Sequence, residues 1–180
     1  AEIVHVVGLF RQRGLAARDS KAKRGELRFA LPAGYCWNDL GKIEKDPDIR
    51  VVDSIALIFR KFRELGSVRQ VLHWLNQSEI QLPVMRRSLR TTVVEWQAPG
   101  YHTVLEQLKN PIYAGAYAYG RTEIRTRIVE GRARKTTGHR RPRERWSVLL
   151  RDHHPGYVHW DRKAFERAIR GNFIDVPLAD

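Results

Sequence analysis

The sequence predicts an α+β fold that is mainly helical, with a helix-turn-helix-like core and a small antiparallel sheet or hairpin. The first observation is a pair of amphipathic helical patterns, at residues 46–65 and 67–76, joined at Gly66. The second is the alternation of polar and β-branched residues over 79–96 and 121–150, which predicts hairpin arms. A chain of 180 residues fits one compact domain or two small ones.

The pattern at residues 46–65 is the clearest helix. We expect Asp46 to cap it, with Pro47 in the first turn, where a missing N–H costs nothing. Gly66 is expected to end it and Ser67 to cap the next helix. The expected buried residues of the two helices are Val51, Val52, Ile55, Ile58, Phe59, Phe62, Val68, Val71, Leu72 and Leu75.

Residues 1–24 suit either a strand or a helix. Their β-branched residues favour a strand, but the apolar residues recur at helical spacing, and Lys and Arg follow toward the end that the helix dipole favours. We expect a helix over 1–24 and an extended basic linker over 25–45, marked by Pro32 and Gly34. The main domain is then 46–175, with a basic hairpin at 121–150.

A short helix is expected from about Gly100 to Lys109. It should bury Val104, Leu105 and Leu108 and expose His102, Thr103, Glu106, Gln107 and Lys109. Asn110-Pro111 ends this helix, and the alternation of small and aromatic residues predicts a strand over 112–119. A last helix, capped by Asp161, is expected to carry Phe165, Ala168 and Ile169.

The charge of the chain favours a polyanionic partner. Lys and Arg number 33 against 20 Asp and Glu, which leaves a net charge of +13, and nucleic acid is the commonest partner of such proteins. A merely soluble surface is the alternative. The single cysteine, Cys36, excludes an intramolecular disulfide framework and a four-cysteine zinc ribbon. Without a membrane span or signal peptide, we expect no membrane partner and a cytoplasmic, nucleoid-associated protein.

Two segments concentrate the positive charge. Between Arg121 and Arg145, ten basic residues face three glutamates, which favours phosphate binding without sequence preference; a solvated loop is the alternative. The basic residues around Gly25 fit two interpretations: a flexible arm that lies on DNA, or a helix C-terminus at which Lys and Arg interact favourably with the helix dipole. The candidate phosphate-binding residues are Arg18, Lys21, Lys23, Arg24, Arg28, Arg121, Arg125, Arg127, Arg132, Arg134 and Lys135.

Sequence-specific readout of DNA needs a rigid element in the major groove, usually a helix with polar side chains near its start. The helix at 100–109 fits this requirement, and the helix at 67–76 would support it near the phosphates. An ordinary packed helix is the alternative. The candidate residues are Tyr101, His102, Thr103, Gln107 and Lys109 on the first helix, and Arg69 and Gln70 on the second.

One stretch, RDHHPGYVHWD, gathers histidine and aspartate as metal-dependent nucleases do. Its spacing matches no ligand frame, and Pro155-Gly156 breaks the regular element that a rigid site would use. We therefore expect no metal and no cofactor. A nuclease using Asp152, His154 and His159 is kept as the weaker alternative.

Four stretches occur in a telling order: GELRFALPAGYCW, DPDIRVVDSIALIFRKFRELGSVRQVLHWLN, LKNPIYAGAYAYGR and HHPGYVHWDRKAFERA. Together, over about residues 15–170, they look like the recombinase domain of the large serine recombinases. The resemblance implies that residues 1–24 end a helix connecting from a catalytic domain. It also implies that Asn110, Pro111, Tyr113 and Gly115 form the family's Asn-Pro-x-Tyr-x-Gly element, after a helix that meets DNA.

The same resemblance implies a structural turn at His154-Pro155, which argues against a metal site. In that family the serine nucleophile lies in a resolvase-type domain that is not in this chain, so we expect no catalytic residue here and no activity alone. Trp96 stands where the family commonly has a tryptophan, but residues 97–100 lengthen the approach to the DNA-facing helix.

The function that the resemblance implies is sequence-specific binding of double-stranded DNA at recombination attachment sites. Other protomers would be contacted through domains that are not in this chain. An RNA-binding module that stacks bases on Tyr117, Tyr119 and Trp146 is the alternative from another class.

Overall fold

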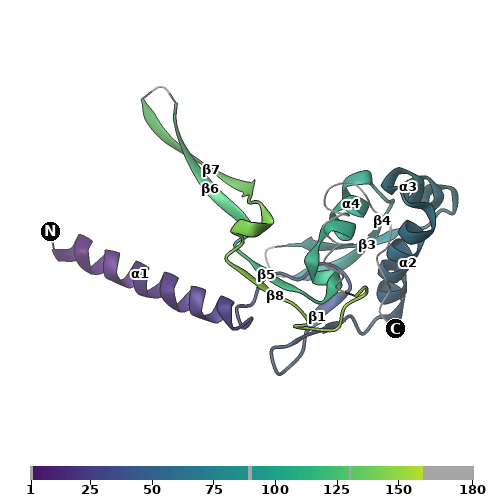
Figure 1. Ribbon diagram of the computed structural model, residues 1–180, viewed down its shortest axis with the longest axis horizontal. Coiled ribbons are helices and arrows are strands. Elements are labelled where there is room, and N and C mark those ends of the chain that lie inside the picture. The colour runs from purple at the N-terminus through teal and green to yellow at the C-terminus, as the bar shows by residue number, and fades with distance from the viewer. Residues whose placement is uncertain (1, 89–90, 130, 160–180) are drawn as a thin grey trace. The chain divides into compact units, whose positions relative to one another are not determined.

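A computed structural model describes residues 2–88, 91–129 and 131–159, without the side chains of residues 2–10. The chain divides into two compact units, residues 1–28 with 117–150 and residues 29–116 with 151–180. Helices and two-stranded antiparallel sheets make up these units (Figure 1), so the α+β class is confirmed. The helix expected from Asp161 onward lies outside the described residues.

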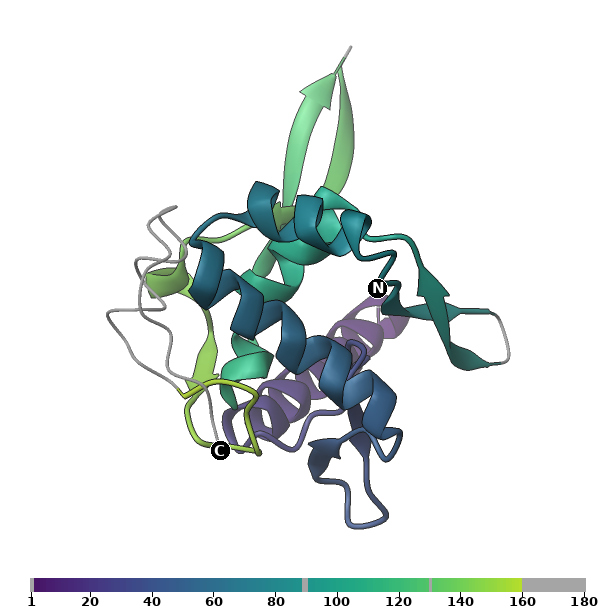
Figure 2. The ribbon, with the colours of Figure 1, turned by 90° about the vertical axis from the view of Figure 1, so that its right-hand side faces the viewer.

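The unit formed by residues 29–116 and 151–180 holds the main core. Its helices are α2 (Ile49–Leu65), α3 (Val68–Gln77) and α4 (Tyr101–Lys109), which contact one another in pairs (Figure 2). Its hairpins are β1 (Tyr35–Trp37) with β2 (Ile43–Lys45), and β3 (Leu82–Arg87) with β4 (Thr92–Gln97). The second hairpin connects α3 to α4, and the helix-turn-helix arrangement stays a prediction.

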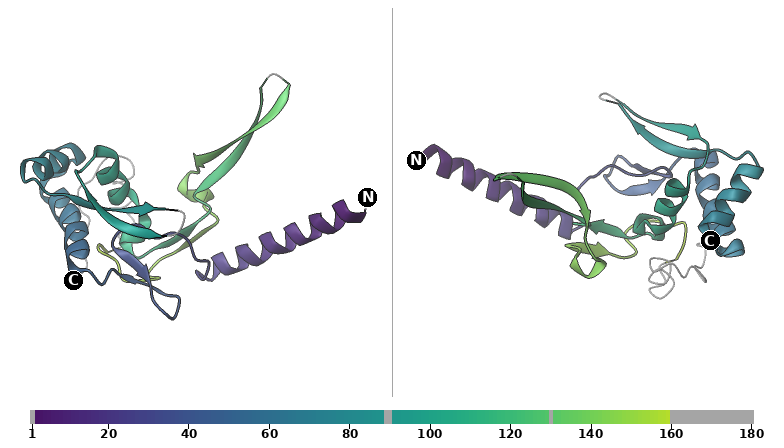
Figure 3. Two further views of the ribbon diagram at one scale, coloured as in Figure 1. Left: turned by 180° about the vertical axis from the view of Figure 1, so that it is seen from behind. Right: turned by 90° about the horizontal axis from the view of Figure 1, so that it is seen from above.

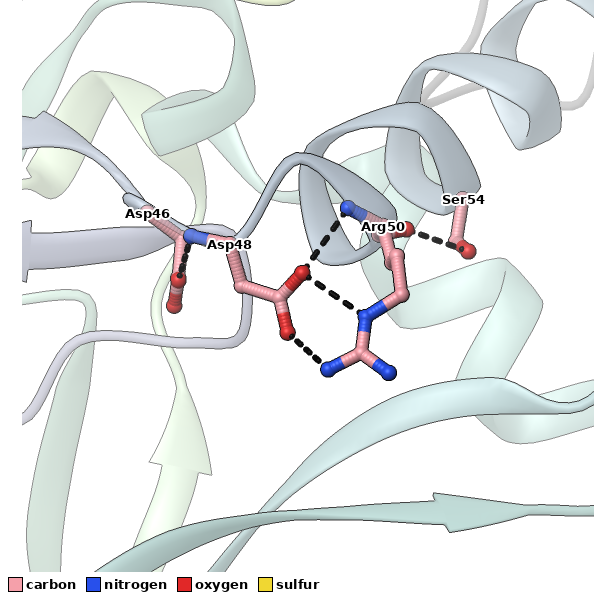
Figure 4. Close-up of polar contacts among 4 residues, drawn as sticks. All are labelled: Asp46, Asp48, Arg50 and Ser54. Carbon is pink, nitrogen blue, oxygen red and sulfur yellow. Dashed lines mark hydrogen bonds and ion pairs between the residues drawn. The ribbon is translucent and has the colours of Figure 1, made fainter.

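The cap of α2 differs from the predicted one. Asp48, two residues after Asp46, is the N-cap: its Oδ1 accepts a hydrogen bond from the backbone N–H of Arg50 at 3.0 Å (Figure 4). Asp46 Oδ1 instead accepts from the Asp48 backbone N–H at 2.9 Å, which orients the cap. The Arg50 guanidinium closes back on the Asp48 carboxylate at 2.7 Å, and this bond holds the pKa of Asp48 below its usual value.

The apolar stripes of α2 and α3 form most of the core, as their spacing predicts. Val52 and Leu72 are half-buried, and every other residue of the two predicted stripes is buried. Each such side chain contributes about 1.5–3 kcal/mol relative to an exposed one. Gly66 ends α2 in the left-handed conformation, with φ of 68°, and its N–H donates to the Phe62 carbonyl.

The basic linker expected over 25–45 is partly a hairpin. Tyr35 pairs with Lys45 and Trp37 with Ile43 in β1 and β2. The Asn38 side-chain oxygen accepts from the Lys42 N–H at 2.8 Å and closes the turn between them. Strands of three residues show too little alternation to be found from sequence, so the prediction missed them.

The strand expected over 112–119 is also corrected. Pro111–Ala114 form a 3₁₀ helix, η1, all four of whose residues are buried, and only Tyr117–Tyr119 form a strand. Asn110 accepts from the Ile112 N–H, and Pro111 supplies the fixed φ of the first position. Gly115 then leaves the turn with φ of 69°. The alternation of small and aromatic residues therefore does not mark a strand over 112–116, whose residues are all buried.

The other unit contains α1 (Glu2–Lys23), the helix predicted at the N-terminus. Its strands pair as β5 (Tyr117–Tyr119) with β8 (Val148–Leu150), and β6 (Thr122–Val129) with β7 (Arg132–Arg140). A 3₁₀ helix, η2, covers Arg143–Arg145. A small cluster of Ala22, Tyr117 and Val148 joins the end of α1 to the β5–β8 pair. The β6–β7 pair is the basic hairpin that the sequence predicts, seen as a long ribbon in Figure 3.

Two glycines with the same backbone conformation make a matched test of this fold. A Cβ at Gly115 would lie 2.6 Å from the His154 carbonyl oxygen, whereas a Cβ at Gly66 would meet nothing within 4 Å. We expect Gly66→Ala to lower the free energy of unfolding by about 1–2 kcal/mol, the cost of the left-handed conformation. Gly115→Ala should cost at least twice as much, measured by urea denaturation. Equal losses would show that the turn does not contact residue 154 closely.

Candidate nucleic-acid interface

The start of α4 presents polar and aromatic side chains to solvent. Tyr101 is 40% exposed, His102 is exposed and Thr103 is half-buried. The opposite side of the helix is anchored, because Val104 and Leu108 are buried in the main core. Arg69 and Gln70 are exposed on α3, which contacts α4. The structure thus places the predicted helix residues on two neighbouring helices of one unit.

Gln107 does not lie where the sequence places it. It is 7% exposed, and its Oε1 has no hydrogen-bond partner among the described residues. Gln107 lines a shallow, mostly apolar groove with Pro83, Met85 and His102. Helical spacing predicts that Gln107 is exposed, as its neighbour Glu106 is. In the structure, residues of β3 line the same groove as Gln107, and spacing within one helix cannot predict a neighbour from another element. Lys109 is half-buried rather than exposed.

The β6–β7 ribbon carries the densest positive charge, and it is a paired ribbon rather than the alternative disordered loop. The five residues nominated within its strands are exposed: Arg125, Arg127, Arg132, Arg134 and Lys135. Glu123 accepts from Arg125 at 2.7 Å and from Arg141 at 3.2 Å. These bonds hold the pKa of Glu123 below its usual value, and the bond from Arg125 has the larger effect. Arg121 is half-buried, with its guanidinium 5.4 Å from the centre of the Trp146 ring.

The second basic cluster surrounds the end of α1. Arg18, Lys21 and Lys23 belong to the helix, so the flexible-arm interpretation is wrong for these three residues. Lys21 and Lys23 lie in the last turn, where the dipole favours positive charge. The Arg18 guanidinium lies 5.9 Å from the centre of the Tyr119 ring, and Arg24 pairs with Glu26 at 2.9 Å. Arg28 is exposed beyond the helix. All five share a unit with the ribbon.

The histidine cluster is part of the main core. His154 is 8% exposed, and its Nε2–H donates to the Ile112 carbonyl oxygen at 2.8 Å. The pKa of His154 is lowered to about 4, mainly by burial; the bond to Ile112 opposes this shift, and the neighbouring His153 adds to it. Within residues 2–88, 91–129 and 131–159 no three His, Cys, Asp or Glu side chains gather as metal ligands would. His154 is thus a buried residue that bonds to the main chain of Ile112, in agreement with the structural turn that the resemblance implies.

The chain thus has a helical unit and an exposed arginine-rich ribbon, which make it an α+β protein with a dense concentration of positive surface charge. Residues 51–170 match the family model named Recombinase, and the chain belongs to this family, whose domain is found in the large serine recombinases. The resemblance predicted from sequence is therefore confirmed.

A relative of the chain is an uncharacterized protein, y4bA/y4pH, of Sinorhizobium fredii. It is 37% identical over 142 residues, which cover 78% of this chain and 20% of the relative. The chain thus spans about a fifth of the length of that relative. No solved structure matches the chain. Among the helices in the described part of the chain, none has the length and apolar character needed to cross a bilayer.

The unpaired amide oxygen of Gln107 gives a stability prediction. A buried oxygen without a hydrogen bond costs about 1–3 kcal/mol, and leucine is of similar size and favours helices. Gln107→Leu should therefore raise the free energy of unfolding by about 1 kcal/mol in urea denaturation. Gln70→Leu, on the exposed face of α3, is the control and should change it by less than about 0.5 kcal/mol. A clear loss in Gln107→Leu would mean that the amide is hydrogen-bonded in solution.

The buried His154 predicts a pH dependence of stability. An unfolded histidine binds a proton near pH 6.5, whereas folded His154 binds one only near pH 4. The free energy of unfolding should therefore fall as pH decreases from about 6.5 to 4, by on the order of 3 kcal/mol. His154→Gln should lose this dependence, and the exposed His159→Gln should keep it, in urea titrations across that range. An unchanged pH profile in His154→Gln would contradict the burial.

Proposed function

We propose that the chain binds double-stranded DNA sequence-specifically at a recombination attachment site, as the non-catalytic part of a site-specific serine recombinase. The observation that carries the proposal is a ribbon of exposed arginines in a chain that belongs to the recombinase family. A net charge of +13 supports a polyanionic partner, and a family that rearranges DNA supplies one.

Two helices would contact the DNA in different ways, α4 at the bases and α3 at the phosphates. The start of α4, with Tyr101, His102 and Thr103, would enter the major groove, since its other side is anchored in the core and the helix is held rigidly. Arg69 and Gln70 of α3 would contact phosphates beside it. Gln107, being buried, would support α4 rather than touch bases.

The unit formed by residues 1–28 and 117–150 would supply affinity for DNA without recognising its sequence. Its phosphate contacts would come from the ribbon and from the basic end of α1, with Arg18, Lys21, Lys23, Arg24 and Arg28. In this proposal α1 is the end of a helix from a catalytic domain, and strand exchange belongs to the longer protein. Its other protomers would be bound through that longer protein as well.

Titration of a fluorescent duplex tests the proposal. The wild-type chain should bind a cognate attachment-site duplex more tightly than a scrambled one, and both affinities should fall steeply with salt. His102→Ala with Thr103→Ala should reduce the discrimination by roughly 1–3 kcal/mol, the value of a lost base contact. His73→Ala, an exposed histidine on α3, is the matched control and should leave the discrimination unchanged.

The outcomes separate the alternatives. Equal affinity for cognate and scrambled duplexes at every salt concentration would refute sequence-specific binding. Tighter binding of single-stranded RNA than of either duplex would favour the RNA-binding alternative. The rings named for that alternative offer little stacking surface, because Tyr117 is buried and Tyr119 and Trp146 are half-buried.

A further inference from the structure

The register of the β6–β7 ribbon places most of its arginines on one face. Cross-strand partners share a face and neighbours along a strand alternate. Arg127 pairs with Arg134, and Arg125 with Thr136, before an irregularity between Glu123 and Arg125. We call this the arginine face, and it carries Arg121, Arg125, Arg127, Arg132, Arg134 and Arg141.

Side-chain bonds agree with this assignment across the irregularity. Glu123 accepts from Arg125 at 2.7 Å and from Arg141 at 3.2 Å, so these three side chains lie on one side. Arg141 is tied to Arg121 through the backbone, its N–H donating to the Arg121 carbonyl at 2.8 Å. The arginine face therefore continues from the described tip of the ribbon to its base.

The opposite side, which we call the isoleucine face, has a different chemistry. Ile124 and Ile128 lie on it and are 65% and 79% exposed. Thr126 and Ala133 share this face, and its basic residues are Lys135 and Arg140. The ribbon is thus two-sided, although both of its sides are open to solvent.

Toward its described tip, the arginine face concentrates positive charge at Arg127, Arg132 and Arg134, which are exposed. Arg127 and Arg134 stand directly opposite each other, about 5 Å apart at Cβ, an arrangement that destabilises a strand pair. In the described part of the face Glu123 is the one carboxylate, and Arg125 and Arg141 already share it. Bound phosphates would relieve this repulsion, because each guanidinium can donate two parallel hydrogen bonds to a phosphate.

We propose that the ribbon binds the DNA backbone through the arginine face alone, with the isoleucine face turned away from the duplex. This inference rests on the proposed function and names the surface that makes its phosphate contacts. Arginines two residues apart along a strand are about 6.6 Å apart, so the face offers two parallel rows of donors. Lys135, on the isoleucine face, makes no contact with DNA.

Swapping neighbouring residues tests whether the arginine face alone contacts DNA, and it changes neither the composition nor the net charge of the chain. Thr126→Arg with Arg127→Thr, and Ala133→Arg with Arg134→Ala, move two arginines from one face to the other. Phosphate contacts carry no sequence information, so a duplex of arbitrary sequence is a sufficient probe. The fourfold variant should bind about 10- to 60-fold more weakly at 0.1 M salt, with a slope of log K against log[salt] smaller by about 1.8.

Conservative and opposite-face variants complete the test. Arg127→Lys with Arg134→Lys keeps the charge on the arginine face and should keep the salt slope. Lys135→Gln should leave affinity within about twofold, whereas Arg127→Gln, its matched variant on the arginine face, should lower it by more. Circular dichroism and thermal unfolding check that each variant keeps the fold, which is expected because both faces are exposed.

Each result decides between the two proposals. Binding by the swapped variant with wild-type affinity and slope would overturn the one-sided contact and leave DNA binding itself intact. A loss in Lys135→Gln as large as that in Arg127→Gln would also overturn it, because a ribbon lying inside a groove contacts DNA with both faces. If the wild-type chain binds no duplex at any salt concentration, the proposed function fails and this inference fails with it.

Discussion

The main unit depends on three buried tyrosine hydroxyls that bond to main-chain carbonyl oxygens far away in sequence. Tyr113 donates to Ala33 at 2.8 Å and Tyr157 donates to Gly34 at 2.7 Å. The Tyr35 hydroxyl lies 3.0 Å from the Ile112 carbonyl oxygen and 2.9 Å from that of Pro155. Burial raises the pKa of all three phenols, so they remain protonated donors. A buried carbonyl left without a donor would cost about 1–3 kcal/mol each.

These bonds hold three irregular segments together, at 33–35, 112–113 and 155–157. Their rings also pack on one another, with Tyr35 and Tyr157 in edge-to-face contact at 5.3 Å between ring centres. His154 joins the cluster at 5.1 Å from Tyr35 and bonds to the same Ile112 carbonyl oxygen. Side-chain hydroxyls therefore add to the backbone bonds between these segments, such as that from the Tyr157 N–H to the Tyr113 carbonyl at 2.7 Å.

The position of α4 follows from this cluster. The helix ends at Lys109, immediately before Asn110 and η1, and η1 is anchored through Ile112 and Tyr113. Val104 and Leu108 anchor its buried side in the main core. The start of α4 therefore projects from a rigid support, a property that a reading helix needs. The described part of the basic ribbon is exposed along most of its length, so core packing should contribute little to its stability.

The sequence by itself determined the elements whose signals are local. The stripe of α2, the stop at Gly66 and the arms of the basic hairpin follow from spacing, conformational freedom and alternation. The order of four stretches was enough to identify the family. Only tertiary structure buried residues 112–116 as a turn and placed Gln107 inside, because the neighbours that cover them are distant in sequence. The cap at Asp48 in place of Asp46 depends instead on local bonds between residues two apart.

The same division holds for the candidate interface. Composition located the positive charge, but it could not say which arginines share a face, because a strand pair sorts its side chains only once its register is known. Likewise, the sequence left His154 in a weaker metal-site alternative, and its bond to the Ile112 carbonyl oxygen is visible only in the structure. Local patterns specify elements, whereas burial and register depend on packing between elements, which no window of sequence contains.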